Sequence, residues 1–235
     1  MSSMNPPAWF VTGTDTEIGK TLVTCALLHA LGESGVPAAG LKPVAAGGQE
    51  RRGKIYNEDV VLIGNAASVH LPPQVINPWL LHTPMAPHLA AKREGREIDM
   101  APIAASYTRA MQSANAVVVE GVGGFRVPLS DKFDSADLAQ LLAIPVVLVV
   151  GMRLGCINHA LLTAEAITHR NLHLAGWVAN TVDPDMLGLQ DNIVALRERL
   201  QAPFLGAIPR LARPTPAAAA AYLDFTRMTG WPVHA

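Results

Sequence analysis

Apolar runs of strand length alternate with longer segments of helical periodicity along most of the chain. The runs at residues 117–119 and 146–150 are apolar without alternation, which is typical of strands covered on both faces. We expect strands at residues 8–12, 38–44, 116–120, 145–150, 174–179 and 204–208, and helices at residues 20–33, 57–67, 99–114, 135–143, 157–170, 187–201 and 216–227. Strands separated by helices favour βαβ crossovers, so the pattern predicts an α/β fold with a mostly parallel central sheet and helices on both faces.

Proline and glycine mark the boundaries of these elements. Pro37, Pro145 and Pro203 each stand between a predicted helix and the strand that follows it. Residues 72–87 are rich in proline and have no regular period, so we expect an ordered loop over one edge of the sheet. No repeat or linker interrupts the pattern, and 235 residues suit one α/β domain, so residues 1–235 are expected to form a single domain.

Composition narrows the class of function. A formal net charge of −1 gives no electrostatic reason to expect a nucleic acid or an anionic membrane as a partner. Two cysteines fit a reducing compartment better than a disulfide framework. Residues 1–7 lack the basic and apolar regions of a secretory signal, and no apolar run reaches the roughly 18 residues of a membrane span. We therefore expect a cytoplasmic protein.

A phosphate-binding pattern stands at the first junction of strand and helix, where residues 13–21 read GTDTEIGKT. A glycine-containing loop that ends in Gly-Lys-Thr at a helix start directs backbone N–H groups at phosphate oxygens. Lys20 would add a positive charge, and the Thr21 hydroxyl would be free to bind Mg2+. The loop is one residue longer between Gly13 and Gly19 than the consensus GxxxxGK[ST], and Thr14 stands in place of the first consensus glycine.

Other polar residues are expected at the same edge of the sheet, because the carboxyl ends of parallel strands meet there. Lys42 closes a predicted strand, Glu120 follows an apolar strand, and residues 155–159 begin the helix after the strand at 145–150. A carboxylate such as Glu120 is costly to bury unless it is paired or binds metal, so it is a candidate Mg2+ ligand. Lys42, one strand from the phosphate loop, is a candidate active-site lysine.

These residues also have ordinary structural interpretations. Lys42 could be a solvated lysine, Glu120 could cap a loop, and Asp59 could be an acid in the first turn of a helix. Cys25 suits a small core residue, and Cys156 lacks a base or a second cysteine nearby in the sequence, which favours packing or backbone contact. The eight histidines show no metal-ligand spacing.

Together the motifs resemble those of the dethiobiotin synthetase family, ATP-dependent ligases that close the ureido ring in biotin synthesis. GTDTEIGKT at residues 13–21 matches the longer phosphate loop of that family, including its extra residue. Further matches follow in order: KPV at 42–44, NED at 57–59, EGVGG at 120–124, GCINHA at 155–160, VAN at 178–180 and GAIP at 206–209. The resemblance spans roughly residues 8–211 and implies a P-loop-type fold.

The resemblance implies conversion of 7,8-diaminononanoate, CO2 and ATP to dethiobiotin, ADP and phosphate with Mg2+. Lys20 and Lys42 would be the catalytic lysines, and Thr21, Asp59 and Glu120 would hold the metal. ATP would contact Thr16, Glu17, Ile18, Gly19, Lys20, Thr21, Asp59, Glu120, Gly121, Val122, Gly123, Asn180, Thr181, Pro209, Arg210 and Leu211, with Asn180 at the adenine edge. The substrate would contact Thr14, Lys42, Ala46, Gly123, Gly155, Cys156, Ile157 and Asn158, the last four from the second subunit of a homodimer.

The implied reaction requires little covalent catalysis by the protein. An amine takes up CO2 to give a carbamate, ATP converts the carbamate to a carbamic–phosphoric anhydride, and the second amine closes the ring. The site must position the carbamate and neutralise phosphoryl charge, which suits two lysines and Mg2+. Ala46 departs from the family, which commonly has a serine four residues after the catalytic lysine; this predicts weaker substrate binding but the same reaction.

Two other functions remain open. A cobyrinate-type amide-forming synthase would share the ATPase fold, but many such enzymes carry a glutaminase domain, for which the chain is too short and has no cysteine motif. A partitioning-type switch ATPase usually has a second lysine at the start of its phosphate loop, where this chain has Gly13, Thr14 and Asp15. We therefore favour the ligase.

Overall fold

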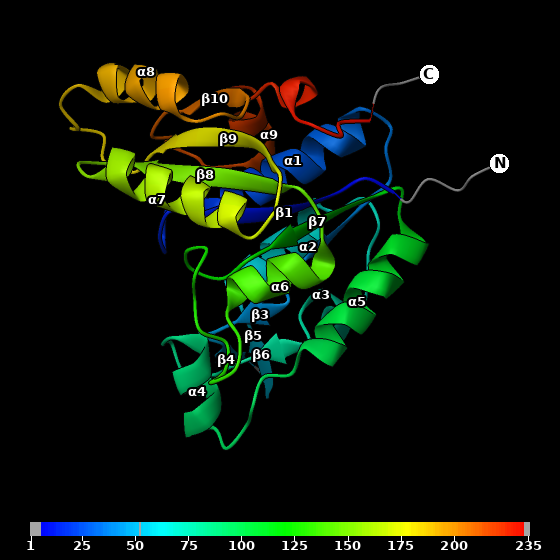
Figure 1. Cartoon of the computed structure of the whole chain (residues 1–235). Coiled ribbons are helices and arrows are strands. Elements are labelled where there is room, and N and C mark those ends of the chain that lie inside the picture. Colours follow the sequence, from blue (N-terminus) through cyan, green and yellow to red (C-terminus); the bar gives the residue numbers. More distant parts are fainter. Residues whose placement is uncertain (1–5, 52, 233–235) are drawn as a thin grey trace.

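The structure, a computed structural model, describes residues 6–51 and 53–232. Its centre is a six-stranded sheet in the order β10-β9-β8-β1-β7-β2, in which all neighbouring strands are parallel (Figure 1). The strands are β1 (Ala8–Gly13), β2 (Ala38–Leu41), β7 (Ala116–Glu120), β8 (Val146–Met152), β9 (Leu174–Thr181) and β10 (Phe204–Ile208). Because β1 lies between β7 and β8, the loops that follow these three strands open at one edge of the sheet.

Helices cover both faces of this sheet (Figure 1). One face carries α1 (Lys20–Glu33), α2 (Glu58–Ala66) and α9 (Pro216–Ala220), and the other carries α5 (Met100–Ser113), α6 (Ser135–Leu142), α7 (Cys156–His169) and α8 (Leu189–Arg199). Alternate residues of β1 serve the two cores: Trp9 and Val11 pack on the α1 side, and Phe10 packs on the α5 side. All residues of β7 and β8 are buried, so the predicted α/β sheet covered on both faces is confirmed.

A smaller group of elements follows β2 and lies below the central sheet in Figure 1. β3 (Val44–Ala45) pairs in parallel with β6 (Trp79–Leu80), and β4 (Gln49–Arg51) pairs with β5 (Lys54–Tyr56) as an antiparallel hairpin. α3 (Pro73–Ile76) and α4 (Pro87–Arg93) complete the group. The expectation of a loop throughout residues 72–87 was wrong, because Pro73 and Pro87 begin helices, a position that proline suits.

The predicted strand at residues 38–44 is two separate strands. β2 ends at Leu41, since the N–H of Lys42 donates to the carbonyl oxygen of Ile76 at 2.8 Å and Pro43 has no N–H. The carbonyl oxygen of Pro43 then accepts from the N–H of Trp79 at 3.1 Å, and the chain continues as β3 beside β6. The break places Lys42 immediately beyond the pair that Leu41 forms with Val119.

The predicted helix at residues 216–227 is also interrupted. α9 ends at Ala220, and a short 3-10 helix, η1 (Phe225–Arg227), follows. Between them Leu223 bridges to Gly206, and the N–H of Asp224 donates to the carbonyl oxygen of Leu205 at 2.7 Å. The segment therefore lies along β10, and helical periodicity alone could not anticipate this contact.

No helix within residues 6–51 or 53–232 combines the length and the apolar character needed to cross a bilayer. Residues 1–5, the greater part of the segment in which we expected no secretory signal, lie outside the described residues.

Candidate active site

The loop between β1 and α1 has the backbone conformation of an anion-binding turn. Glu17 and Gly19 both have positive φ, 58° and 87°, and α1 begins at Lys20 with no side chain capping its first N–H groups. These N–H groups and the positive end of the helix dipole are free to bind an anion. Gly19 cannot be replaced without strain, because a Cβ there would lie 2.2 Å from Asn180 Nδ2.

Lys20 folds back over its own loop. Its Nζ donates to the carbonyl oxygen of Asp15 at 2.6 Å, and the Asp15 carboxylate forms an ion pair with Arg153, which follows β8. Lys20 is 6% exposed; burial, and secondly the positive charge of Lys42, lower its pKa to about 8. No carboxylate within the described part of the chain forms an ion pair with Lys20, which leaves its charge available to a bound phosphate.

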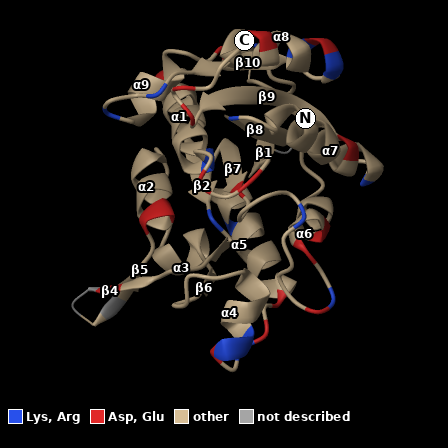
Figure 2. Ribbon diagram, turned by 90° about the vertical axis from the view of Figure 1, so that its left-hand side faces the viewer, with Lys and Arg blue, Asp and Glu red and all other residues tan. Residues whose placement is uncertain are grey.

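The second part of the site is an acid–base cluster at the ends of β2 and β7. Lys42 Nζ lies 2.5 Å from Glu120 Oε1 and 2.9 Å from the carbonyl oxygen of Gly121. Thr21 Oγ1 donates to the same Glu120 oxygen at 2.9 Å, and Asp59 Oδ2 lies 3.3 Å from Lys42 Nζ. Figure 2 shows that backbone segments of both acidic and basic residues meet between α1, β2 and β7, whereas many of the other charged residues stand on outer helices and loops.

The cluster is buried, and this determines its electrostatics. Glu120 is 0% exposed and Lys42 is 3% exposed. Burial alone would lower the pKa of Lys42, but the Glu120 and Asp59 carboxylates outweigh it, so the pKa lies above its usual value and the side chain is charged. Cys25, on α1, has its pKa raised to about 12 by burial and secondly by Glu120, so its thiol is not a nucleophile at neutral pH.

The residues expected to hold Mg2+ fit that ion. Glu120 Oε2 is buried without a hydrogen-bond partner, a costly arrangement that a cation would relieve. Thr21 and Asp59 add a hydroxyl and a partly exposed carboxylate, both oxygen ligands of the kind that Mg2+ prefers. Among the described residues no cluster of three or more His, Cys, Asp or Glu side chains could hold a metal by itself, so substrate oxygens would have to complete this site.

The remaining residues expected to bind ATP follow three strands of the sheet, and one group of them lies against the phosphate loop. Gly123, with φ 61°, lies close to Thr16, since a Cβ on Gly123 would be 3.3 Å from Thr16 Oγ1. The turn formed by Gly121, Val122 and Gly123 therefore lies against the loop. Thr181 ends β9, and Pro209, Arg210 and Leu211 directly follow β10.

Asn180, also at the end of β9, has a structural contact that the sequence did not predict. Its Nδ2 donates to the carbonyl oxygen of Ile18 at 2.8 Å, which anchors the phosphate loop to the sheet. One of the two Nδ2 hydrogens is thus engaged, and the Oδ1 acceptor is the group that suits an adenine amino group.

The residues expected to bind the substrate fall into two groups. Thr14 and Ala46 follow the first strands of the chain: Thr14 lies in the phosphate loop, where its Oγ1 accepts from the N–H of Gly151 at 3.3 Å, and Ala46 stands just after β3. Residues 155–158 begin α7 beyond Arg153. Cys156 is 2% exposed, so its side chain is a core residue, and Asn158 is exposed.

Arg153, Asp15 and Asn77 were not among the predicted site residues. Asn77 Nδ2 donates to the carbonyl oxygen of Lys42 and thereby fixes the backbone that carries the lysine. Asp15 lies within the phosphate-loop motif, which was a usable signal. Arg153 and Asn77 reach the site through contacts distant in sequence and carried no local signal.

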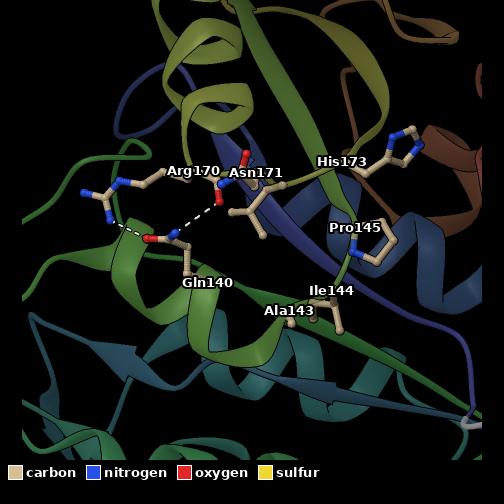
Figure 3. A pocket seen from close by; sticks show the side chains of 8 residues that line it. Gln140, Ala143, Ile144, Pro145, Arg170, Asn171 and His173 are labelled. Atoms are coloured by element: carbon tan, nitrogen blue, oxygen red, sulfur yellow. Dashed lines mark hydrogen bonds between the residues drawn. The ribbon is translucent and has the colours of Figure 1, made fainter.

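A cavity of about 260 Å3 lies at the opposite edge of the sheet, where residues 143–145 lead into β8 and residues 170–173 lead into β9 (Figure 3). Two of its polar residues bond to each other: Arg170 Nη1 donates to Gln140 Oε1 at 2.7 Å, and Gln140 Nε2 donates to the carbonyl oxygen of Arg170 at 3.1 Å. In contrast to Glu120 Oε2, no buried side-chain nitrogen or oxygen of the residues that line this cavity lacks a partner.

The chain is similar to known proteins over nearly its whole length. A protein-family model described as an AAA domain matches residues 8–218. Two curated proteins named ATP-dependent dethiobiotin synthetase BioD are each 58% identical. That of Janthinobacterium sp. (strain Marseille) matches over 95% of this chain and 96% of its own length, and that of Ralstonia nicotianae over 92% and 94%. The protein of the same name from Aromatoleum aromaticum is 56% identical over 93% of this chain and 97% of its own length.

Solved structures with low sequence identity show the same fold. The MinC:MinD cell division protein complex of Aquifex aeolicus has a TM-score of 0.57 and 15% identity, over 92% of this chain and 91% of that one. The signal recognition particle receptor FtsY of Elizabethkingia anophelis, in complex with GDP, has a TM-score of 0.52 and 13% identity over 97% of this chain. This chain spans 63% of that FtsY chain.

Proposed function

Since the chain belongs to the ATP-dependent dethiobiotin synthetase family, we propose that it makes dethiobiotin from 7,8-diaminononanoate, CO2 and ATP in biotin biosynthesis. The observation that carries this proposal is the place of Lys42, whose Nζ bonds to the same Glu120 oxygen as Thr21 Oγ1, at 2.5 and 2.9 Å. A buried ammonium group thus stands beside the helix start that would bind the triphosphate. That is where an anionic acceptor of the γ-phosphoryl group has to lie.

The phosphate loop would hold ATP through its backbone. The free N–H groups at the start of α1 would bind phosphate oxygens, and Lys20 would exchange its bond to the Asp15 carbonyl for a bond to phosphate. Asn180 would direct Oδ1 to the adenine amino group, because its Nδ2 already holds the loop. The turn after β10, with Pro209, Arg210 and Leu211, would line the base.

Lys42 would hold the carbamate against the γ-phosphate. Its backbone is fixed by Asn77, and its ammonium group can neutralise charge on the carbamate and on the transferred phosphoryl group. The carbamate oxygen attacks the γ-phosphorus and displaces ADP. The second amine of the substrate then attacks the carbamoyl carbon, expels phosphate and gives up a proton. The protein forms no covalent bond in this sequence; it supplies positioning and charge.

Thr21, Asp59 and Glu120 are the side chains that would hold Mg2+, which would neutralise charge on the phosphoryl oxygens. The buried, unpartnered Glu120 Oε2 supports this assignment. Asp59, whose side chain is 41% exposed, stands on the solvent side of the cluster and suits a ligand that binds together with the nucleotide.

We propose further that the enzyme is a homodimer with the substrate at the subunit interface. α7 begins after Gly155, which has φ 93°, and a Cβ on Gly155 would meet no atom within 4 Å. The neighbouring Leu154 is 94% exposed, which suits an apolar residue that a second subunit covers. The start of α7 would offer the N–H groups of Ile157 and Asn158 to the carboxylate of the substrate. The Cys156 N–H donates to the carbonyl oxygen of Arg153 at 3.0 Å and its side chain is buried, so Cys156 would contribute only by its place at the helix start.

The proposal covers residues 1–235 as one ATP-binding domain that acts in the cytoplasm and binds neither nucleic acid nor membrane. Its support is the net charge of −1 and two cysteines that are both free in the structure.

The test is product formation from labelled substrate. Purified protein is incubated with diaminononanoate, [13C]bicarbonate, Mg2+ and ATP, and dethiobiotin is sought by mass spectrometry. We expect dethiobiotin one mass unit heavier than standard, formed in step with phosphate and only when the diamine is present. Phosphate release without the diamine, and no ring product, would instead favour a switch ATPase and refute the proposal.

A further inference from the structure

The cluster around Glu120 is arranged as an occupied cation site, and the cation in it is Lys42. Lys42 Nζ lies 2.5 Å from Glu120 Oε1, 3.3 Å from Asp59 Oδ2 and 2.9 Å from the carbonyl oxygen of Gly121. All three contacts are with oxygen atoms, and two of these atoms are carboxylate oxygens. A divalent metal ion would seek the same kind of oxygen set.

Two other oxygen atoms of the cluster, Thr21 Oγ1 and Glu120 Oε2, are available to a metal ion. The Thr21 hydroxyl donates its proton to Glu120 Oε1 at 2.9 Å, so the lone pairs of Thr21 Oγ1 remain available to a cation. Glu120 Oε2 is buried and has no partner. The ammonium group of Lys42, by contrast, occupies Glu120 Oε1 and faces Asp59.

An ammonium group and a divalent ion cannot share this space. Lys42 is 3% exposed and Glu120 is 0% exposed, so water would screen the repulsion between the two cations only weakly. Nor can Lys42 leave without a replacement, because an unpaired carboxylate in the interior is strongly destabilising. The departure of one cation is therefore coupled to the arrival of the other.

We propose that Lys42 is the resident cation of the Glu120 site in the nucleotide-free protein, and that a divalent metal ion enters only as Lys42 moves away. This inference rests on the proposed function, which assigns the metal site and the lysine. The γ-phosphate of ATP gives Lys42 a new anionic partner, and its departure frees Glu120 and Asp59 for the metal. Nucleotide and metal then bind with strong positive coupling, and Lys42 reaches its reactive position as the metal enters.

The test is a titration with Mn2+, a paramagnetic probe of the metal site, without any nucleotide and with free Mn2+ measured by EPR. The unsubstituted protein binds Mn2+ weakly, because only the small fraction of molecules with Lys42 displaced is competent. Lys42→Met, which has a similar length and no charge, is expected to bind Mn2+ at least about tenfold more tightly, since that fraction becomes nearly complete.

Lys20→Met is the matched control. It removes a positive charge from the same site, but Lys20 Nζ bonds to the Asp15 carbonyl and not to Glu120. We expect it to show no comparable gain in Mn2+ affinity. An equal gain in both variants would reveal only a general charge effect and would overturn the proposal, as would the absence of a gain in Lys42→Met.

If Lys42→Met does not fold without metal, thermal unfolding replaces Mn2+ affinity as the measurement that tests the exchange. The proposal then predicts that Mn2+ restores cooperative thermal unfolding in the absence of nucleotide. The double variant Lys42→Met/Glu120→Gln keeps only the partly exposed carboxylate of Asp59 in the cluster and no buried one to compensate, so it is expected to fold without Mn2+ and to show no such response. Failure of Mn2+ to restore Lys42→Met would overturn the proposal.

The outcome for the proposed reaction is read separately, from dethiobiotin formation by the unsubstituted protein. Product formation together with unchanged Mn2+ affinity in Lys42→Met refutes the cation exchange and leaves the reaction standing. A gain in Mn2+ affinity without any dethiobiotin supports the exchange and refutes the proposed function.

Discussion

The two ends of the parallel strands differ in how completely their buried polar side chains are hydrogen-bonded; we call the carboxyl ends the carboxyl edge and the amino ends the amino edge. At the carboxyl edge, Lys42 and Glu120 are buried together, and Glu120 Oε2 has no partner. At the amino edge, Gln140 and Arg170 line a cavity of about 260 Å3, bond to each other, and Arg170 also pairs with Asp137. The cavity lies at the amino edge, and the buried carboxylate oxygen without a partner lies at the carboxyl edge.

This difference indicates which edge performs chemistry. A buried carboxylate oxygen without a partner costs more free energy than a neutral polar atom, and a cation bound there would relieve that cost. Among the described residues, Glu120 Oε2 is the one buried carboxylate oxygen in that condition. We therefore expect substitutions at the carboxyl edge to change catalysis, and substitutions at the amino edge to change stability alone.

The largest contrast is expected between Lys42→Met and Gln140→Ala. Lys42→Met should lower kcat about 10²–10³-fold, the usual effect of removing one group that stabilises transition-state charge. Gln140→Ala should leave kcat unchanged, and both variants should still bind nucleotide by calorimetry. Undiminished turnover in Lys42→Met would contradict its catalytic role, and a slow Gln140→Ala would break the contrast between the edges.

Glu120→Gln keeps the shape of the side chain and removes its charge. The Mg2+ concentration for half-maximal turnover should rise at least about tenfold, since even residues that only orient metal ligands are commonly worth 10–100-fold. Asp137→Asn, the same kind of change at the amino edge, should leave the Mg2+ dependence unaltered. A Glu120→Gln enzyme with an unchanged Mg2+ curve would exclude Glu120 as a ligand.

Ala46→Ser tests a small polar addition at the carboxyl edge. A new neutral hydrogen bond worth about 0.5–1.5 kcal/mol should lower KM for the diamine roughly two- to tenfold without changing the product. Steady-state kinetics at saturating ATP measure this, with Ala143→Ser at the amino edge as the control. An unchanged KM in Ala46→Ser would show that this position does not face the substrate.

Asp137→Asn should affect stability alone. Burial by itself would raise the pKa of Asp137, but the N–H of Asp134 and the Arg170 guanidinium outweigh it, so the pKa lies below its usual value. A carboxyl group with a lower pKa in the folded than in the unfolded chain stabilises the fold above its unfolded pKa, and this contribution is lost as pH falls through the folded pKa.

Urea unfolding measures this effect. At pH 7, Asp137→Asn should lower the free energy of unfolding by roughly 1 kcal/mol, a modest amount because the side chain is 36% exposed. The difference should shrink as pH falls below the usual aspartate pKa of about 3.9. A difference that stays constant with pH would assign the effect to something other than the charge of Asp137.

Much of the carboxyl edge could be predicted because its signals are local. The phosphate loop lies in one short motif, and Glu120 directly follows an apolar strand. The contact between Lys42 and Glu120 could not be predicted from the residues alone, since it requires β7 to lie between β1 and β2. The order of strands in a sheet is a property of the tertiary structure, and no local pattern carries it.

The errors and the contacts that were not predicted also depend on tertiary structure. Pro43 ended the strand predicted at residues 38–44, and this signal was present but outweighed by the apolar residues around it. For Asn180, whose predicted adenine contact stays a prediction, no local pattern indicated the hydrogen bond that its amide group donates to the phosphate loop across 162 residues. At the amino edge, the hydrogen bond between Arg170 and Gln140 joins the end of α7 to α6, and such a contact cannot be predicted from periodicity.

The central claim is that a carbamate oxygen at the carboxyl edge attacks the γ-phosphorus of ATP. A single turnover with C18O2 in unlabelled water, stopped before the label exchanges with the solvent, tests it most directly. The account predicts one 18O atom in the released phosphate and the other in the ureido carbonyl of dethiobiotin. Phosphate without 18O would mean that water attacks ATP, and would contradict the account.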